Sequence, residues 1–199
     1  MESPLAALLP IAILWLAAGV VADGLPRLDR ARSLRRRAGH LLILTLVGLT
    51  LTVTVLAAGL FSAGNTSADQ AAAALDIAGI PALVVAVCTV RRVRRLWAGA
   101  GAFATAPETP APYGLRAAAA HPLIGLPLQV TGVLTVPALI AASGTGLFAT
   151  PGVTGPAITV GALVVIAIGV RHALRHSRLA ERARPDAERS ARAAGPLHV

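Results

Sequence analysis

Long runs without any charged residue are the feature that most limits how this chain can fold. The longest extends over 49 residues from Pro122 to Val170, and residues 3–22 and 41–68 form two more. Crossing the roughly 30 Å hydrocarbon core of a bilayer takes about 20 residues of α-helix. A soluble domain needs polar side chains over its whole surface, whereas here only 14% of the residues are charged and 55% are hydrophobic. The sequence therefore predicts an all-α, polytopic membrane protein.

The apolar runs predict five transmembrane helices. A single helix of 49 residues would be roughly 74 Å long, and the turn-forming sequence SGTGLFATPGVTGP in its middle predicts a break. The run from Gln70 to Val90 carries one acidic residue, Asp76. The expected spans lie near residues 3–22, 41–62, 68–90, 122–142 and 155–170.

The arginines predict how these helices are oriented. All 18 cationic side chains are arginines: six lie in residues 23–40, none in 62–70, five in 91–121, none in 143–154 and seven after 170. Every arginine thus falls on one side of a five-helix chain, and the positive-inside rule assigns that side to the cytoplasm. We therefore expect a protein of the cell membrane with its N-terminus outside and its C-terminus inside.

The two ends of the chain have alternative readings. The first apolar run could be a cleavable signal peptide, but the chain begins Met1-Glu2-Ser3 without positive charge and places its arginines after the run. An uncleaved first helix is therefore favoured. We expect residues 1–176 to form one transmembrane domain and 177–199 a flexible cytoplasmic tail, since the tail becomes polar and Ala-rich after Pro185.

A basic chain with pI near 11.7 also raises the question of nucleic-acid binding. The arginines adjoin apolar runs and aromatic residues make up only 3%, which is unlike a nucleic-acid-binding face. The lack of lysine excludes a phosphate-binding loop of the GxxxxGK type. Arginine without lysine, together with abundant Ala, Gly and Pro, indicates a GC-rich and therefore bacterial coding sequence. We expect no nucleic-acid partner and no cofactor.

An internal similarity suggests a duplicated helical hairpin. Residues 82–91 (ALVVAVCTVR) match residues 162–171 (ALVVIAIGVR) at six of ten positions. His40 and His121 open the second and fourth spans 81 residues apart. Helices two and three would then correspond to helices four and five.

Asp76 is the acidic residue that must lie inside a span. Ser67 and Gln70 read as a capping box that starts the third helix near Ala68, which places Asp76 about 12 Å deep. Equal depths on the second and fourth helices fall near Thr54 and Thr135, so the three side chains are predicted to form a polar layer. The alternative is that Asp76 lies in the first turn of its helix, among the lipid headgroups.

The remaining polar residues are expected to contact the membrane and not to form a catalytic or metal site. Arginines beside the third and fifth spans are expected to reach anionic lipid headgroups; these are Arg91, Arg92, Arg94, Arg95, Arg171 and Arg175. His172 and His176 have the i, i+4 spacing of a metal pair. The neighbouring arginines repel a divalent cation and no third ligand is apparent, so no metal site is expected.

The function that these features favour is a non-enzymatic accessory or assembly subunit of a membrane complex. We expect contact with other membrane helices in a homo- or hetero-oligomer, where a heteromer favours the accessory role and a homodimer favours a permease. A small permease that works as an oligomer is the alternative, since Asp76 and the threonines could line a path. A membrane enzyme is a third interpretation, and it would need more acidic or histidine residues at one depth than the chain offers.

Overall fold

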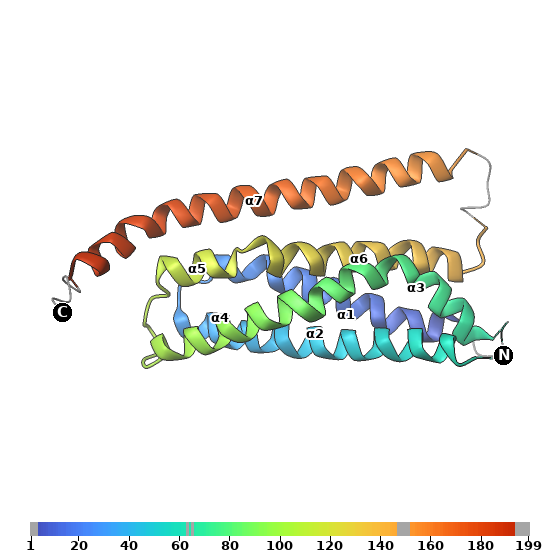
Figure 1. Cartoon of the computed structure of the whole chain (residues 1–199), viewed down its shortest axis with the longest axis horizontal. Helices are drawn as coiled ribbons and strands as arrows, with labels where there is room; N and C mark the ends of the chain where they lie inside the picture. The colour runs from blue at the N-terminus through green and yellow to red at the C-terminus, as the bar shows by residue number, and fades with distance from the viewer. Residues whose placement is uncertain (1–3, 63, 65, 147–151, 194–199) are drawn as a thin grey trace, which may run out of the picture.

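The computed structural model of the chain is all-α (Figure 1). It describes residues 4–62, 64, 66–146 and 152–193, with side chains up to residue 185. Its helical elements are α1 (Pro4–Gly24), the 3-10 turn η1 (Leu25–Arg27), α2 (Ala31–Leu60), α3 (Ser67–Val84), the π-turn η2 (Val85–Thr89), α4 (Val90–Phe103), α5 (Tyr113–Ala119), α6 (Pro122–Ala142) and α7 (Thr154–Ala193). Among the described residues, five helical stretches are long and apolar enough to cross a membrane. The predicted all-α class with five candidate transmembrane helices is confirmed.

Two helices continue well past the apolar runs, at the end of the bundle where α1 ends and α6 begins. α2 starts at Ala31 and not near residue 41, and the helix through α3, η2 and α4 continues to Phe103 and not only to residue 90. Arginine, leucine and alanine favour helix, and neither extension contains proline. Arg35 lies 5.0 Å from the centre of the Trp97 ring and joins the two extensions. We call this end of the bundle the arginine end.

The start of α3 corrects the predicted cap by one residue. Thr66 is the N-cap, and its hydroxyl accepts a hydrogen bond from the Asp69 amide at 3.2 Å. The Asp69 carboxylate accepts from the Thr66 amide at 2.9 Å. The capping box is therefore Thr66 with Asp69, and the prediction of Ser67 with Gln70 is wrong, because an ionised carboxylate is a better acceptor than an amide for the free N–H groups of a helix N-terminus.

α1 packs between α2 and α6. Trp15 is fully buried there, and its Nε1 donates to Thr52 Oγ1 at 3.1 Å. A Cβ on Gly48 would lie 3.4 Å from the Trp15 ring, and one on Gly132 would lie 3.3 Å from its backbone. The two glycines let α2 and α6 approach α1 from both sides.

A proline in α6 explains a hydrogen bond between two helices. Pro127 has no N–H, so the carbonyl of Leu123 loses its usual donor four residues on. Thr89, fully buried at the end of the π-turn, donates its hydroxyl to this carbonyl at 2.7 Å. The contact satisfies a carbonyl that no water in a bilayer could reach.

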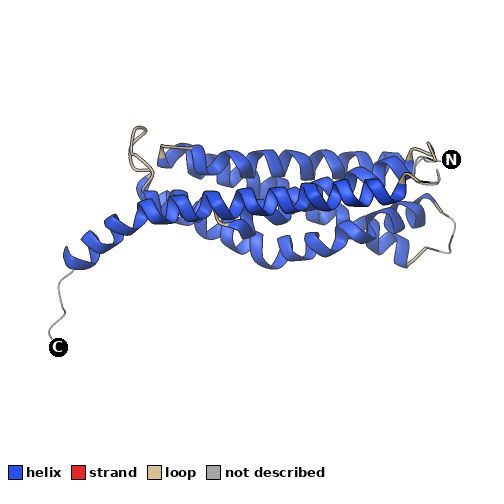
Figure 2. Cartoon of the chain, turned by 90° about the horizontal axis from the view of Figure 1, so that it is seen from above, coloured by secondary structure: helices blue, strands red, loops and turns tan. Residues whose placement is uncertain are grey.

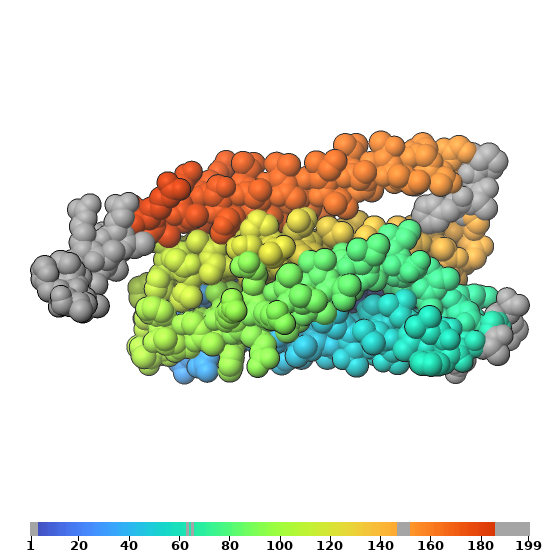
Figure 3. Space-filling view, in the orientation of Figure 1, coloured from blue at the N-terminus to red at the C-terminus, as the bar shows by residue number. Residues whose placement is uncertain are grey.

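α7 lies apart from the other helices along the half nearer Thr154, although all of them run side by side along the long axis (Figures 1 and 2). In its apolar stretch of 18 residues, only 6% is buried within the chain, whereas 39% of the corresponding stretch of α1 is buried. A cleft of about 630 Å³ separates this half from α6, and an opening is visible in the space-filling view (Figure 3). At the other end, α7 continues beyond the predicted span at 155–170, and Pro185 lies inside the helix without ending it. The flexible tail stays a prediction.

The two predicted hairpins differ in how closely their helices pack. A Cβ on Gly59 of α2 would overlap that of Ala72 on α3, so these helices are in tight contact. α6 and α7 are instead separated by the cleft along the half of α7 nearer Thr154. The matching segments differ as well, because 85–89 is a π-turn whereas 165–169 is regular α-helix. The duplication therefore also stays a prediction.

Candidate functional site at the arginine end of α7

Asp23, near the end of α1, binds arginines from two parts of the chain. Its carboxylate pairs with Arg27 at 3.1 Å, with Arg175 of α7 at 2.9 Å, and with Arg171 one turn earlier on α7. Arg175 also donates to the backbone carbonyl of Asp23 at 3.0 Å. The carboxylate is 18% exposed, so it is largely shielded from solvent. It joins the first and last helices of the fold.

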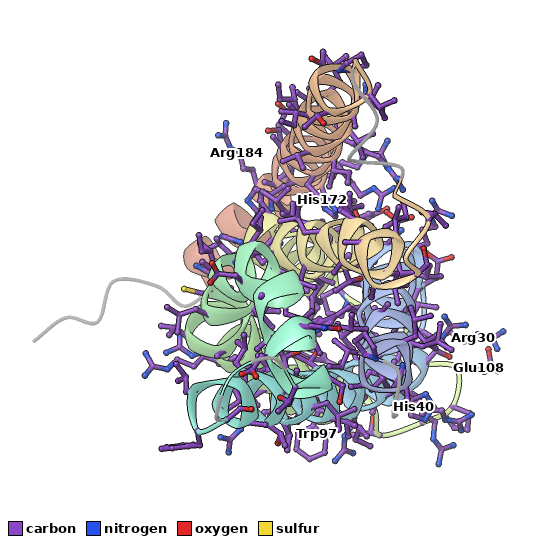
Figure 4. All side chains as sticks on the ribbon, turned by 90° about the vertical axis from the view of Figure 1, so that its right-hand side faces the viewer. Arg30, His40, Trp97, Glu108, His172 and Arg184 are labelled. Atoms are coloured by element: carbon purple, nitrogen blue, oxygen red, sulfur yellow. The ribbon has the colours of Figure 1, made fainter. Side chains whose placement is uncertain are left out.

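A second set of hydrogen bonds lies beside it, between α7 and α6. His172 is 4% exposed, and its Nε2 lies 3.0 Å from Oε1 of Gln129 (Figure 4). The Gln129 amide donates in turn to the carbonyl of Gly19 on α1 at 3.3 Å. Gly125 makes room for the imidazole, since a Cβ there would overlap the ring. Three helices are thus linked by one buried polar chain.

α5 completes the contacts of this end. Its Arg116 donates to the carbonyl of Pro26 at 3.3 Å and pairs with Asp29 at 3.0 Å. His176 of α7 lies with Nδ1 3.2 Å from the Ala117 carbonyl, and its ring centre is 5.1 Å from that of His121. α7 is therefore held by its charged half, against α1, α5 and α6 together.

The arginines of these ion pairs, together with Asp29, border an open groove of about 920 Å³. It lies between α7, α5 and the turn that follows α1, and we call it the arginine groove. Six arginines line it: Arg27, Arg116, Arg171, Arg175, Arg178 and Arg182. Asp29 is the acidic residue in the lining, and Asp23 lies behind Arg171 and Arg175. Guanidinium groups gathered in this way suit an anionic ligand with phosphate or carboxylate oxygens.

Asp76, Thr54 and Thr135, the predicted polar layer, lie in three different environments. Asp76 is exposed and lines a shallow hollow between α2 and α3, whereas Thr54 is exposed and lines a different one beside the start of α1. Thr135 is buried on α6, and its hydroxyl donates to the Gly132 carbonyl at 2.6 Å. Among the described residues, no hydrogen bond joins the three side chains.

The arginines expected at lipid headgroups fall into two groups. Arg91, Arg94 and Arg95 are exposed on α4, and Arg92 is half-buried beside them. Arg171 and Arg175 are the two that pair with Asp23. Headgroup contact by either group stays a prediction.

The two histidines with metal-pair spacing have other partners, Gln129 for His172 and the Ala117 carbonyl for His176. Within the described part of the chain, no group of three or more His, Cys, Asp or Glu side chains is placed to hold a metal ion.

Sequence reasoning did not single out Asp23 or Arg116. One signal was present in the sequence: Asp23 directly follows the first apolar run and Arg171 directly follows the last, which places opposite charges at one end of the two spans.

The arrangement as a whole holds α7 firmly at one end, opens a cationic groove there, and leaves the apolar half of the helix uncovered by the chain. No protein-family model, curated protein or solved structure matches the chain.

Proposed function

We propose that this integral membrane protein is a non-enzymatic accessory or assembly subunit, and that it binds a helix of its partner through α7. The observation that carries the proposal is the apolar half of this helix, of which the chain itself buries almost nothing. Helices that complete their packing within one chain, such as α1, bury far more. A helix that is anchored by ion pairs at one end and uncovered at the other is suited to pack against a second protein.

The apolar cleft between α6 and α7 supports a helical partner. Val133, Val136 and Ile140 line it from α6, and Ala157 and Gly161 line it from α7. The last two stand four residues apart on one face, the small-xxx-small spacing at which transmembrane helices approach closely. A Cβ on Gly161 would meet nothing within 4 Å, so a neighbouring backbone has room to enter.

A photo-crosslinking residue at Val160, inside the cleft, tests this proposal in native membranes. We expect one protein adduct of defined mass, and we expect Gly161→Leu to reduce its yield about tenfold or more because the added side chain fills the cleft. Ala162→Leu is the matched control, because this neighbouring alanine does not line the cleft. Its adduct yield should be unchanged.

Two results would contradict the accessory role. The absence of any protein adduct at Val160 would show that lipid alone covers the cleft. An adduct of twice the mass of the chain would show a homodimer, which is the arrangement that the permease alternative requires.

We also propose that the arginine end faces the cytoplasm of a bacterial cell, with the protein in the cell membrane. The ends of α1 and α4 and the starts of α2 and α6 lie at this end, together with the charged part of α7 (Figure 1). The positive-inside rule then sets the orientation. A reporter fused after Ala191 is expected to read cytoplasmic, and one inserted at Gly64 to read external. A single reporter on the wrong side would overturn the five-span topology.

A further inference from the structure

The arginine groove carries more positive charge than the acidic residues around it can balance. Asp23 serves three of its arginines and Asp29 serves Arg116. Arg178 and Arg182 also line the groove, and neither forms an ion pair with any acidic side chain that the structure describes. Bringing six guanidinium groups to one groove costs free energy through mutual repulsion. An anionic ligand in the groove would reduce this repulsion between the guanidinium groups.

The lining of the groove is apolar at one end and cationic at the other. Along α7 it passes from Ala167 and Val170, through Leu174, to Arg178 and Arg182. These 16 residues span about 22 Å of helix from Ala167 to Arg182. Val170 is the last residue of the long uncharged run, so the change in lining falls where hydrocarbon gives way to headgroups. A soluble anion would use only the cationic end, whereas a phospholipid matches both.

The cationic end is also held in position before any ligand binds. Arg171, Arg175 and Arg178 lie on one face of α7 at i, i+4 and i+7. Asp23 fixes the first two, and Arg116 is fixed by Asp29 and the Pro26 carbonyl. Side chains already ordered lose less entropy on binding than free ones do.

We propose that the arginine groove binds one anionic phospholipid, with its phosphate among the arginines of α7 and the first part of its acyl chains along Ala167 and Val170. This is a defined site for a single lipid, distinct from general contact of arginines with a charged surface. Arg178 and Arg182 supply charge that the fold does not use, and the arginines paired with Asp23 supply fixed donors for phosphate oxygens.

Lipid titration of the purified full-length chain, followed by native mass spectrometry, tests the proposal. Phosphatidylglycerol and phosphatidylcholine with the same acyl chains are the two probes. We expect phosphatidylglycerol to bind at least tenfold more tightly, and the double variant Arg178→Gln, Arg182→Gln to weaken its binding about 25-fold, since each such arginine contributes about fivefold. The control, Arg94→Gln with Arg95→Gln, removes the same charge from exposed positions on α4 and should change binding less than twofold.

A second variant separates a lipid from a soluble anion. Ala167→Trp fills the apolar end without changing charge, so it should weaken phosphatidylglycerol binding and leave the binding of inorganic phosphate as it was. The proposal is overturned if both double variants lose lipid equally, if phosphatidylcholine binds as tightly as phosphatidylglycerol, or if inorganic phosphate binds as tightly as the intact lipid.

Discussion

Replacing Asp23 with alanine is expected to release the charged half of α7 from the bundle. The change leaves Arg27, Arg171 and Arg175 without their shared carboxylate at a place where Asp23 is 18% exposed and Arg175 is 21% exposed. Removing one partner of a fully buried ion pair costs about 3–5 kcal/mol. Partial exposure screens this pair, so we expect a loss of about 2 kcal/mol. Spin labels at Ala98 and Ser177, in a chain whose Cys88 has been replaced, should show a longer and broader distance distribution between α4 and α7.

Asp29→Ala is the matched control. It removes the same charge from the lining of the arginine groove, but Asp29 is 77% exposed and, within the described part of the chain, forms a single ion pair, with Arg116. The expected loss is below about 0.5 kcal/mol, with an unchanged distance distribution. If Asp23→Ala left the distribution as narrow as in the unaltered chain, the contacts of His172 with Gln129 and of His176 with Ala117 would be sufficient to hold α7.

Trp15→Ala is expected to cost the most stability of any single replacement considered. The side chain is fully buried where α1 packs against α2, with its ring beside Gly48 and its Nε1 hydrogen-bonded to Thr52. Truncating a buried tryptophan costs about 3–5 kcal/mol in soluble proteins. Unfolding in mixed micelles with increasing sodium dodecyl sulfate should measure the loss.

Trp97→Ala provides the comparison. This ring is 41% exposed and lies beneath Arg35 at 5.0 Å. Losing an exposed cation–π contact costs about 0.5–1 kcal/mol. Equal losses of stability on replacing Trp15 and Trp97 would contradict the burial of Trp15 within the bundle.

The five membrane-length helices could be predicted from the sequence because a bilayer demands long uncharged runs, whereas the short helix α5 was not predicted. The predicted span at 122–142 coincides with α6, whose ends are marked by His121 and by the turn at Gly144. The starts and ends of α2 and α4 could not be predicted, since hydropathy marks the edge of the hydrocarbon and says nothing of a helix that continues into water. Arg35 and Trp97 stabilise such a continuation.

The candidate site was harder to predict because its contacts span most of the chain. Asp23 meets Arg171 and Arg175 across 148 and 152 residues, and Gln129 meets Gly19 across 110. No spacing rule connects such distant positions. Asp76 attracted attention as a charge within a span, but the structure places it on an exposed face of α3. The buried polar contacts use Gln129 and His172, which can be neutral and therefore cost less to bury.

The ion pair between the first and last helices has a consequence for how the protein is made. Ribosomes add about 5–20 residues each second, and Arg175 follows Asp23 by 152 residues. Asp23 therefore emerges roughly 8–30 s before the arginine that neutralises it. During that interval Arg27 is the ion-pair partner available to the carboxylate. The contact of the Trp15 backbone with Gly132 forms only once α6 has been made. α7 thus docks onto the bundle after α1 to α6 have been made, and a chain cut short before α7 would leave Asp23 without Arg171 and Arg175.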